Sequence, residues 1–224
     1  MKRTAIITSI LVLFLFQSIC SGAQEQAPYR NEIQSFKKSD SLQQPKKNTI
    51  LFVGSSSFRL WKDIQQAFPT HTIINRGFGG SSFPDVIRYA DDIIFPYQPK
   101  QIVIYCGEND FASSDTVTSG LVVQRFEKLF TLIREKLPNV AVAYVSMKPS
   151  PSRWQLKEKM QDANKQIKTF LKKKKKTAFI DVWEPMLNEE GKPKDELFVG
   201  DKLHMNEKGY AIWQKKIEPY LLQD

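Results

Sequence analysis

The chain has 224 residues, of which 41% are hydrophobic and 25% are charged, and its formal net charge is +9. This length and composition suit one domain with a full hydrophobic core. Much of the positive excess is one run, Lys172 to Lys176, which lacks the interleaved aromatic residues of a nucleic-acid-binding surface. We therefore expect no nucleic-acid partner.

Residues 1–23 have the pattern of a secretory signal peptide. Two basic residues precede an apolar run from Ala5 to Phe16, and the small residues that end at Ala23 offer a cleavage site. Because the run is too short to span a bilayer, we expect an exported protein, periplasmic or extracellular, without a stable membrane span. Lipid anchoring at Cys20 is the less favoured alternative. After cleavage only Cys106 remains, which excludes an intrachain disulfide.

Residues 24–48 form a polar lead-in, in which an amphipathic stretch around Ile33 and Phe36 is expected to dock as a short helix. From residue 49 to residue 224, strand and helix patterns alternate. Apolar strands are predicted at Ile50 to Val53, Thr72 to Asn75, Gln101 to Tyr105, Val140 to Ser146 and Ala178 to Asp181. Helices are predicted at Pro84 to Asp92, Thr118 to Lys136, Arg153 to Lys173 and Asn206 to Leu222. This order predicts an α/β domain whose parallel sheet is covered on both faces.

Polar and glycine-rich segments follow the predicted strands. Gly54-Ser55-Ser56-Ser57 follows the first strand, a segment with three glycines ending at Gly80 follows the second, and Gly107-Glu108-Asn109-Asp110 follows the third. Because parallel strands end at one edge of a sheet, these segments are expected to meet there. They would offer a hydroxyl, backbone donors and a side-chain amide to one ligand.

A base for that hydroxyl is found near the C terminus. Asp201 precedes His204 by three residues, a spacing at which the carboxylate can hold one imidazole nitrogen while the other activates a hydroxyl. Each signal alone has a simpler reading, since such a pair is more often a solvated ion pair and a serine run is more often a loop. Their convergence on one sheet edge favours a catalytic site.

These segments together resemble the four motif blocks of the SGNH or GDSL-type hydrolases, a family of esterases and acylhydrolases. The resemblance implies a three-layer α/β/α sandwich with a five-stranded doubly wound parallel sheet, similar to flavodoxin. It implies a nucleophile at Ser56, an orienting carboxylate at Asp201 and a base at His204. It also implies an oxyanion hole formed by the backbone N–H groups of Ser56 and Gly80 and by the amide of Asn109. The chain departs from the family pattern at Ser55, where an aspartate is usual.

The expected function is that of a secreted serine esterase, with O-acetyl groups on carbohydrate or short-chain acyl esters as substrates. No metal or cofactor is expected, because no cluster of metal-binding residues surrounds His71, the only other histidine. One alternative is a non-catalytic glycan- or surface-binding module on the same fold. Another is a basic adhesion protein that would depend on the lysine run, although that run is most simply a solvated helix end.

Overall fold

The computed structural model of the protein describes residues 27–223. The predicted signal peptide, its cleavage site and Cys20 lie outside this part of the chain. Within it, no helix is both long enough and apolar enough to cross a membrane.

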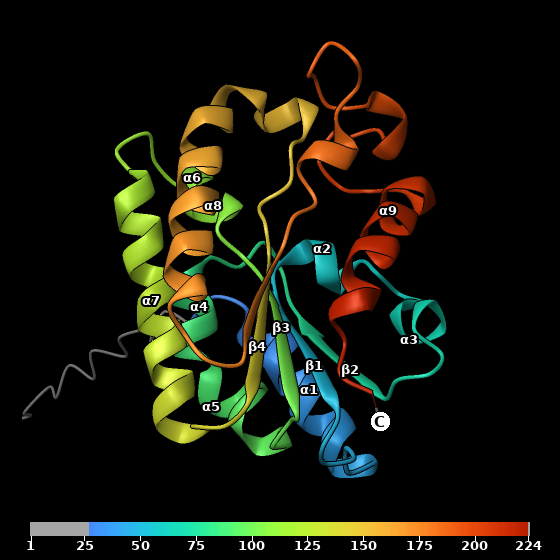
Figure 1. Ribbon diagram of the computed structural model, residues 1–224. Coiled ribbons are helices and arrows are strands. Elements are labelled where there is room, and N and C mark those ends of the chain that lie inside the picture. Colours follow the sequence, from blue (N-terminus) through green and yellow to red (C-terminus); the bar gives the residue numbers. More distant parts are fainter. Residues whose placement is uncertain (1–26, 224) are drawn as a thin grey trace, which may run out of the picture.

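The core of the fold is a five-stranded parallel sheet in the order β2-β1-β3-β4-β5 (Figure 1). This is the flavodoxin-like order, so the predicted fold class is confirmed. Each predicted strand is present within one or two residues of its expected bounds. The strands are β1 (Ile50–Gly54), β2 (Ile73–Gly77), β3 (Gln101–Tyr105), β4 (Ala141–Val145) and β5 (Thr177–Ile180).

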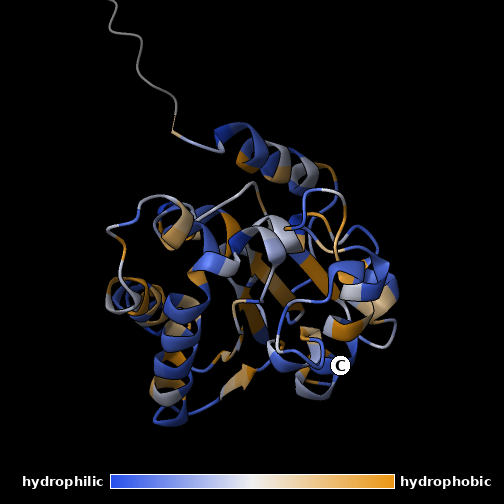
Figure 2. Ribbon diagram, turned by 90° about the horizontal axis from the view of Figure 1, so that it is seen from above, coloured by the Kyte–Doolittle hydropathy of each residue, from blue (hydrophilic) through white to orange (hydrophobic). Residues whose placement is uncertain are grey.

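Helices cover both faces of the sheet because side chains along each strand point alternately to opposite sides. Leu51 and Val53 of β1 join one apolar cluster, whereas Ile50 and Phe52 join the other. Seen from above, the hydrophobic strands lie between the helical layers (Figure 2). The first cluster contains residues of α1 (Arg30–Leu42), α4 (Phe83–Arg88), α5 (Ala90–Ile93), α6 (Glu108–Ala112), α7 (Ser119–Lys136) and α8 (Lys157–Lys172). The second contains residues of α2 (Ser56–Arg59), α3 (Ile64–Ala67) and α9 (Glu207–Ile217).

The helix predicted from Pro84 to Asp92 is two helices, α4 and α5, separated at Tyr89, and the short helices α2, α3 and α6 were not predicted. Short 3-10 helices account for the other differences. The predicted helix up to Leu222 ends at Ile217, since Pro219 has no N–H to continue the hydrogen-bond ladder. The helix predicted from Arg153 is preceded by a 3-10 segment and starts at Lys157. The 3-10 segments are η1 (Phe95–Tyr97), η2 (Pro151–Leu156), η3 (Glu184–Met186), η4 (Asp195–Leu197) and η5 (Glu218–Tyr220).

The amphipathic stretch in the polar lead-in forms helix α1, as expected. Ile33 is buried in the core, and Asp40 binds both Arg76 at the end of β2 and the Tyr97 hydroxyl. The Glu32 carboxylate accepts a hydrogen bond of 3.1 Å from the backbone N–H of Gly79. Helix α1 therefore packs on the glycine-rich loop that follows β2.

Strand β1 lies between β2 and β3 in the sheet. The chain continues from β1 to β2 on one side and from β3 to β4 on the other, so the strand order reverses between β1 and β3. In open α/β sheets, ligands bind in the crevice outside the carboxyl ends of the strands at such a switch point. Residues 181–206, between β5 and α9, contain η3 and η4 and rise above this edge at the top of Figure 1. This geometry brings the chain preceding α9 back toward the end of β1.

Candidate active site

The turn after β1 exposes one of three consecutive serines. Gly54 has φ 140°, and a Cβ at this position would lie 1.9 Å from the carbonyl oxygen of Tyr105, so only glycine fits. Ser55 and Ser57 are buried, with 5% and 3% of their surfaces exposed, whereas Ser56 is partly exposed. Ser56 is thus the hydroxyl that this turn presents to the crevice.

Ser56, His204 and Asp201 form a continuous chain of contacts. Ser56 Oγ lies 2.9 Å from His204 Nε2, and His204 Nδ1 lies 2.6 Å from Asp201 Oδ2. The two segments are 148 positions apart in the sequence and meet only through the fold. The arrangement is that of a hydroxyl, a base and an orienting carboxylate.

A tight turn holds the Asp201 carboxylate in place. Lys202 has φ 57°, and the backbone N–H groups of Leu203 and His204 each donate a 2.9 Å hydrogen bond to Asp201 Oδ1. Partial burial raises the pKa of Asp201, but these bonds and the bond from the imidazole lower it by more, to about 2. Asp201 is therefore ionised at neutral pH and can hold the proton on Nδ1.

The expected oxyanion donors lie next to each other. A Cβ placed on Gly80 would lie 3.7 Å from Asn109 Nδ2, so the loop after β2 approaches the side-chain amide that follows β3. Asn75 fixes the start of that loop, because its amide donates to the Phe58 carbonyl and accepts from the Gly77 N–H. The glycine at position 80 leaves its backbone exposed beside Asn109.

Three charged residues near Asn109 contact one another in a way that the sequence analysis did not predict. Glu108 and Lys148 are buried, and Lys148 Nζ lies 3.1 and 3.0 Å from the two carboxylate oxygens of Glu108. Arg153 donates a 2.8 Å hydrogen bond to Asn109 Oδ1 and lies 3.6 Å from Glu108 Oε2. Only a charge-pairing argument between the segments after β3 and β4 could have found them in the sequence.

Other residues near the motif blocks are structural. Trp61, Phe78, Phe83 and Phe111 are at most 2% exposed and belong to the core, whereas Trp154 is partly exposed.

Cys106 is buried, and burial raises the pKa of its thiol, which disfavours a nucleophilic thiolate. His71 is buried and precedes β2, at the end of the strand opposite Gly77. Among residues 27–223, no group of three His, Cys, Asp or Glu side chains could hold a metal ion.

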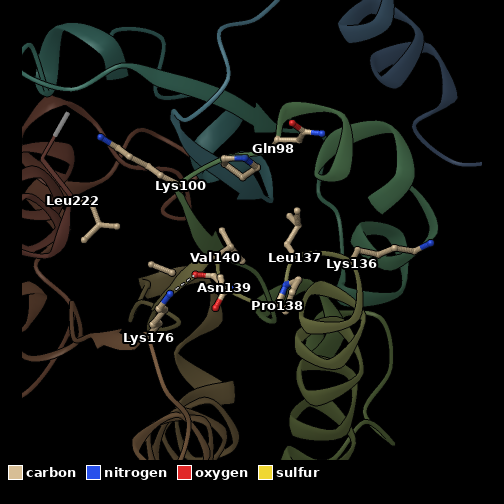
Figure 3. Close-up of a pocket in the computed structure, with 11 residues that line it drawn as sticks. Gln98, Lys100, Lys136, Leu137, Pro138, Asn139, Val140, Lys176 and Leu222 are labelled. Carbon is tan, nitrogen blue, oxygen red and sulfur yellow. Dashed lines mark hydrogen bonds between the residues drawn. The ribbon is translucent and has the colours of Figure 1, made fainter.

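A cavity of about 650 Å³ lies at the opposite edge of the sheet, where the strands begin (Figure 3). Its lining includes Lys100, Lys136 and Lys176 around an apolar floor with Leu137 and Val140. None of its eleven lining residues is Ser, Cys, His, Asp or Glu. The cavity therefore lacks the hydroxyl, imidazole and carboxylate that occur together at the carboxyl edge.

The sequence pattern of the GDSL-like lipase/acylhydrolase family matches residues 48–212. The chain belongs to this family. It is therefore a hydrolase of ester bonds, as the sequence analysis expected. A comparison with curated proteins gave no match.

Solved structures of several bacterial proteins share the fold. A Streptococcus pneumonia protein with the provisional name of a platelet activating factor aligns with TM-score 0.74 and 22% identity, covering 86% of this chain and 92% of its own. A provisionally named acylhydrolase from Bacteroides fragilis aligns with TM-score 0.74 and 19% identity, covering 87% and 97%. A GDSL-like lipase from Bacteroides thetaiotaomicron aligns with TM-score 0.70 and 21% identity, covering 84% and 95%. At these identities the likeness shows the fold alone.

Proposed function

We propose that this family member is an exported serine esterase that hydrolyses small carboxylic esters through an acyl-Ser56 intermediate. The observation that carries the proposal is the contact chain from Ser56 Oγ to His204 Nε2 at 2.9 Å and from His204 Nδ1 to Asp201 Oδ2 at 2.6 Å. A purely binding module has no need of a base beside a hydroxyl.

In the first half-reaction, His204 Nε2 takes the proton of the Ser56 hydroxyl while the oxygen attacks the ester carbonyl carbon. The backbone N–H groups of Ser56 and Gly80 and the amide of Asn109 receive the negative oxygen of the tetrahedral intermediate. His204 then gives its proton to the departing alcohol, and an acyl-serine remains. Asp201 keeps the imidazole in the required tautomer and stabilises its positive charge.

In the second half-reaction, water attacks the acyl-serine carbonyl. His204 takes a proton from the water, and the same donors receive the oxyanion. Collapse of the intermediate breaks the bond to Ser56 Oγ, which regains its proton from His204. The carboxylic acid is released and the enzyme returns to its starting state.

The surroundings of the site support a small acyl group, such as the O-acetyl group of a carbohydrate or a short-chain ester. A long acyl chain needs an extended apolar groove to bury it. Phe78, Phe83 and Phe111, which adjoin the oxyanion segments, are at most 1% exposed and are used by the core. In these segments Gly80 is exposed and Asn109 is partly exposed, and such small residues suit a small acyl substituent.

The test is hydrolysis of p-nitrophenyl acetate and of a longer-chain p-nitrophenyl ester by the protein and by its Ser56→Ala and His204→Ala variants. Each variant is expected to lose at least about 10⁴-fold in kcat, since a triad acts as a unit. Ser57→Ala is the matched control, because Ser57 is buried next to the nucleophile, and it should keep the rate within about threefold. Equal rates for all four proteins would refute the esterase and favour a glycan- or surface-binding module.

Export is a separate part of the proposal and rests on residues 1–23 as a signal peptide, with residues 49–224 as the hydrolase domain. Mass spectrometry of the protein recovered outside the cytoplasm should give a chain that begins at Gln24. A lipid-modified chain beginning at Cys20 would replace this assignment with membrane anchoring. Full-length protein retained in the cytoplasm would contradict both.

A further inference from the structure

The oxyanion donor from Asn109 differs from the two backbone donors because its direction is not fixed by the main chain. A side-chain amide carries a donor on Nδ2 and an acceptor on Oδ1, and a half-turn about its last bond exchanges them. With Oδ1 facing the substrate, the amide would repel the oxyanion that it should stabilise. Some contact must therefore select the orientation in which Nδ2 faces the crevice.

Two complementary contacts make this selection. Nδ2 of Asn109 donates a 3.0 Å hydrogen bond to the Ser81 carbonyl, and Oδ1 accepts a 2.8 Å bond from Arg153 Nη2. A flipped amide would place Oδ1 against the carbonyl and its N–H groups against the guanidinium, two repulsive contacts. Because Nδ2 has two N–H groups, the bond to Ser81 leaves a second one for the oxyanion.

Arg153 is itself held by a buried ion pair. Its Nη1 lies 3.6 Å from Glu108 Oε2, and Glu108 also bonds the Lys148 amine and the Tyr105 hydroxyl. Burial raises the pKa of Glu108, but the charges of Lys148 and Arg153 lower it by more, so the carboxylate stays ionised. Arg153 belongs to η2, after β4, whereas Glu108 and Asn109 adjoin each other in α6, after β3. The pair thus ties the two segments together at the site.

We propose that Arg153 is a positioning residue for ester hydrolysis: anchored on Glu108, it holds the Asn109 amide with Nδ2 toward the oxyanion. The inference rests on the proposed role of Asn109 as an oxyanion donor. This role does not require an acidic or anionic substrate, because the guanidinium acts through its contacts with Glu108 and with Asn109 Oδ1. Two cations beside one carboxylate also give the cluster a net positive charge next to the developing oxyanion.

The test is a double-mutant cycle on p-nitrophenyl acetate with Arg153→Met, Asn109→Ala and the variant carrying both. Asn109→Ala is expected to lower kcat by about 10²-fold or more, the usual cost of losing one oxyanion donor. Arg153→Met should lower kcat by about tenfold or more with KM within about twofold, and should cost less than about threefold once Asn109 is absent. Arg153→Lys keeps one donor to Oδ1 and should recover part of the loss.

Lys157→Met is the matched control, since Lys157 carries a cation near η2, lies over the Trp154 ring and does not contact Asn109. It should keep kcat within about twofold. Losses of Arg153→Met and Asn109→Ala that multiply in the combined variant would overturn the inference. So would a raised KM at unchanged kcat, which would make Arg153 a substrate-binding residue, or a loss that is fully explained by the unfolded fraction in a thermal melt. Full activity of Ser56→Ala would instead refute the proposed function itself, which separates the two failures.

Discussion

Removal of the Glu108 carboxylate is expected to cost more stability than removal of the Lys148 amine, although the two form one ion pair. Both side chains are nearly excluded from water, at 6% and 1% exposure. Glu108→Leu would leave the buried Lys148 amine with only the Tyr105 hydroxyl at 3.3 Å as a partner. It would also remove the carboxylate that pairs with Arg153. Breaking a buried pair in this way costs about 3–5 kcal/mol. For a domain of this size, that corresponds to a fall in Tm of roughly 6–20 °C.

In Lys148→Met, the buried charge that remains, the Glu108 carboxylate, still has several partners. The Glu108 carboxylate would keep the Tyr105 hydroxyl, the Lys148 backbone N–H at 3.2 Å and the Arg153 guanidinium. We therefore expect a smaller cost, about 1–3 kcal/mol, the usual penalty for a buried polar group that loses one partner. Combining Glu108→Leu with Lys148→Met should recover stability relative to Glu108→Leu alone, since no unpaired buried cation remains.

Urea unfolding followed by circular dichroism measures these differences, with the m-value compared among variants. The expected order of unfolding free energy is parent, then Lys148→Met, then Glu108→Leu, with the combined variant above Glu108→Leu. Equal costs for the two single variants would refute the argument that Arg153 shares the Glu108 charge. A combined variant less stable than Glu108→Leu would refute the argument that the buried cation is the source of the penalty.

Three further predictions concern the turn, the orienting acid and the lysine run. Gly54→Ala should destabilise the protein by at least about 3 kcal/mol in urea unfolding. Gly200→Ala is the control, because a Cβ there meets nothing within 4 Å, and it should change the free energy of unfolding by less than about 0.5 kcal/mol. Similar values for both variants would contradict the turn geometry. Because the pKa of Asp201 is lowered to about 2, its carboxylate in the folded protein keeps its charge until the pH falls to about that value. The stability that this charge contributes is complete above the ordinary Asp pKa and is lost as the pH falls from there through about 2. An NMR titration of its carboxyl carbon with a midpoint near 4 would contradict the assigned hydrogen bonds. Replacing Lys172 to Lys175 by glutamine should leave kcat/KM for p-nitrophenyl acetate within about twofold, because the run precedes β5 at the edge opposite the site. A tenfold loss would argue for an electrostatic role of these lysines.

Local patterns in the sequence were sufficient for the five strands and the long helices of the fold, but not for the short helices α2, α3 and α6. Near-continuous apolar runs predicted the five strands, because strands of a parallel sheet are buried on both faces. The chemistry of the segments indicated a serine turn, a glycine-rich loop, an amide and the Asp201–His204 pair. The resemblance to the family's motif blocks then selected Ser56, Gly80 and Asn109 as the nucleophile and oxyanion donors. The structure joins Ser56, His204 and Asp201 in one chain of contacts and brings Gly80 beside Asn109 at the same sheet edge. Their catalytic roles are predictions that the variants test.

Contacts between distant segments were beyond sequence reasoning. Nothing local shows that Arg153 meets Asn109, because the contact depends on how η2 after β4 packs against α6 after β3. Nothing local shows that Lys148 is buried, since a lysine between a strand and a proline has the pattern of an exposed loop. The docking of α1 on the Gly79 loop likewise depends on the Glu32 side chain meeting a backbone N–H that is 47 positions away.

The sequence by itself thus determined the order of strands and helices, the family and the residue types that carry the chemistry. The order of strands and helices follows from the periodicity of short segments, which is a physical property of each segment alone. The family and the site residues follow from the resemblance of four motif blocks to those of the GDSL-type hydrolases. The tertiary structure decided which serine of the turn is exposed, how the Asn109 amide is oriented and which carboxylate neutralises the buried lysine. These depend on packing and on low-dielectric pairing between segments, so they exist only once the sheet has assembled and excluded water.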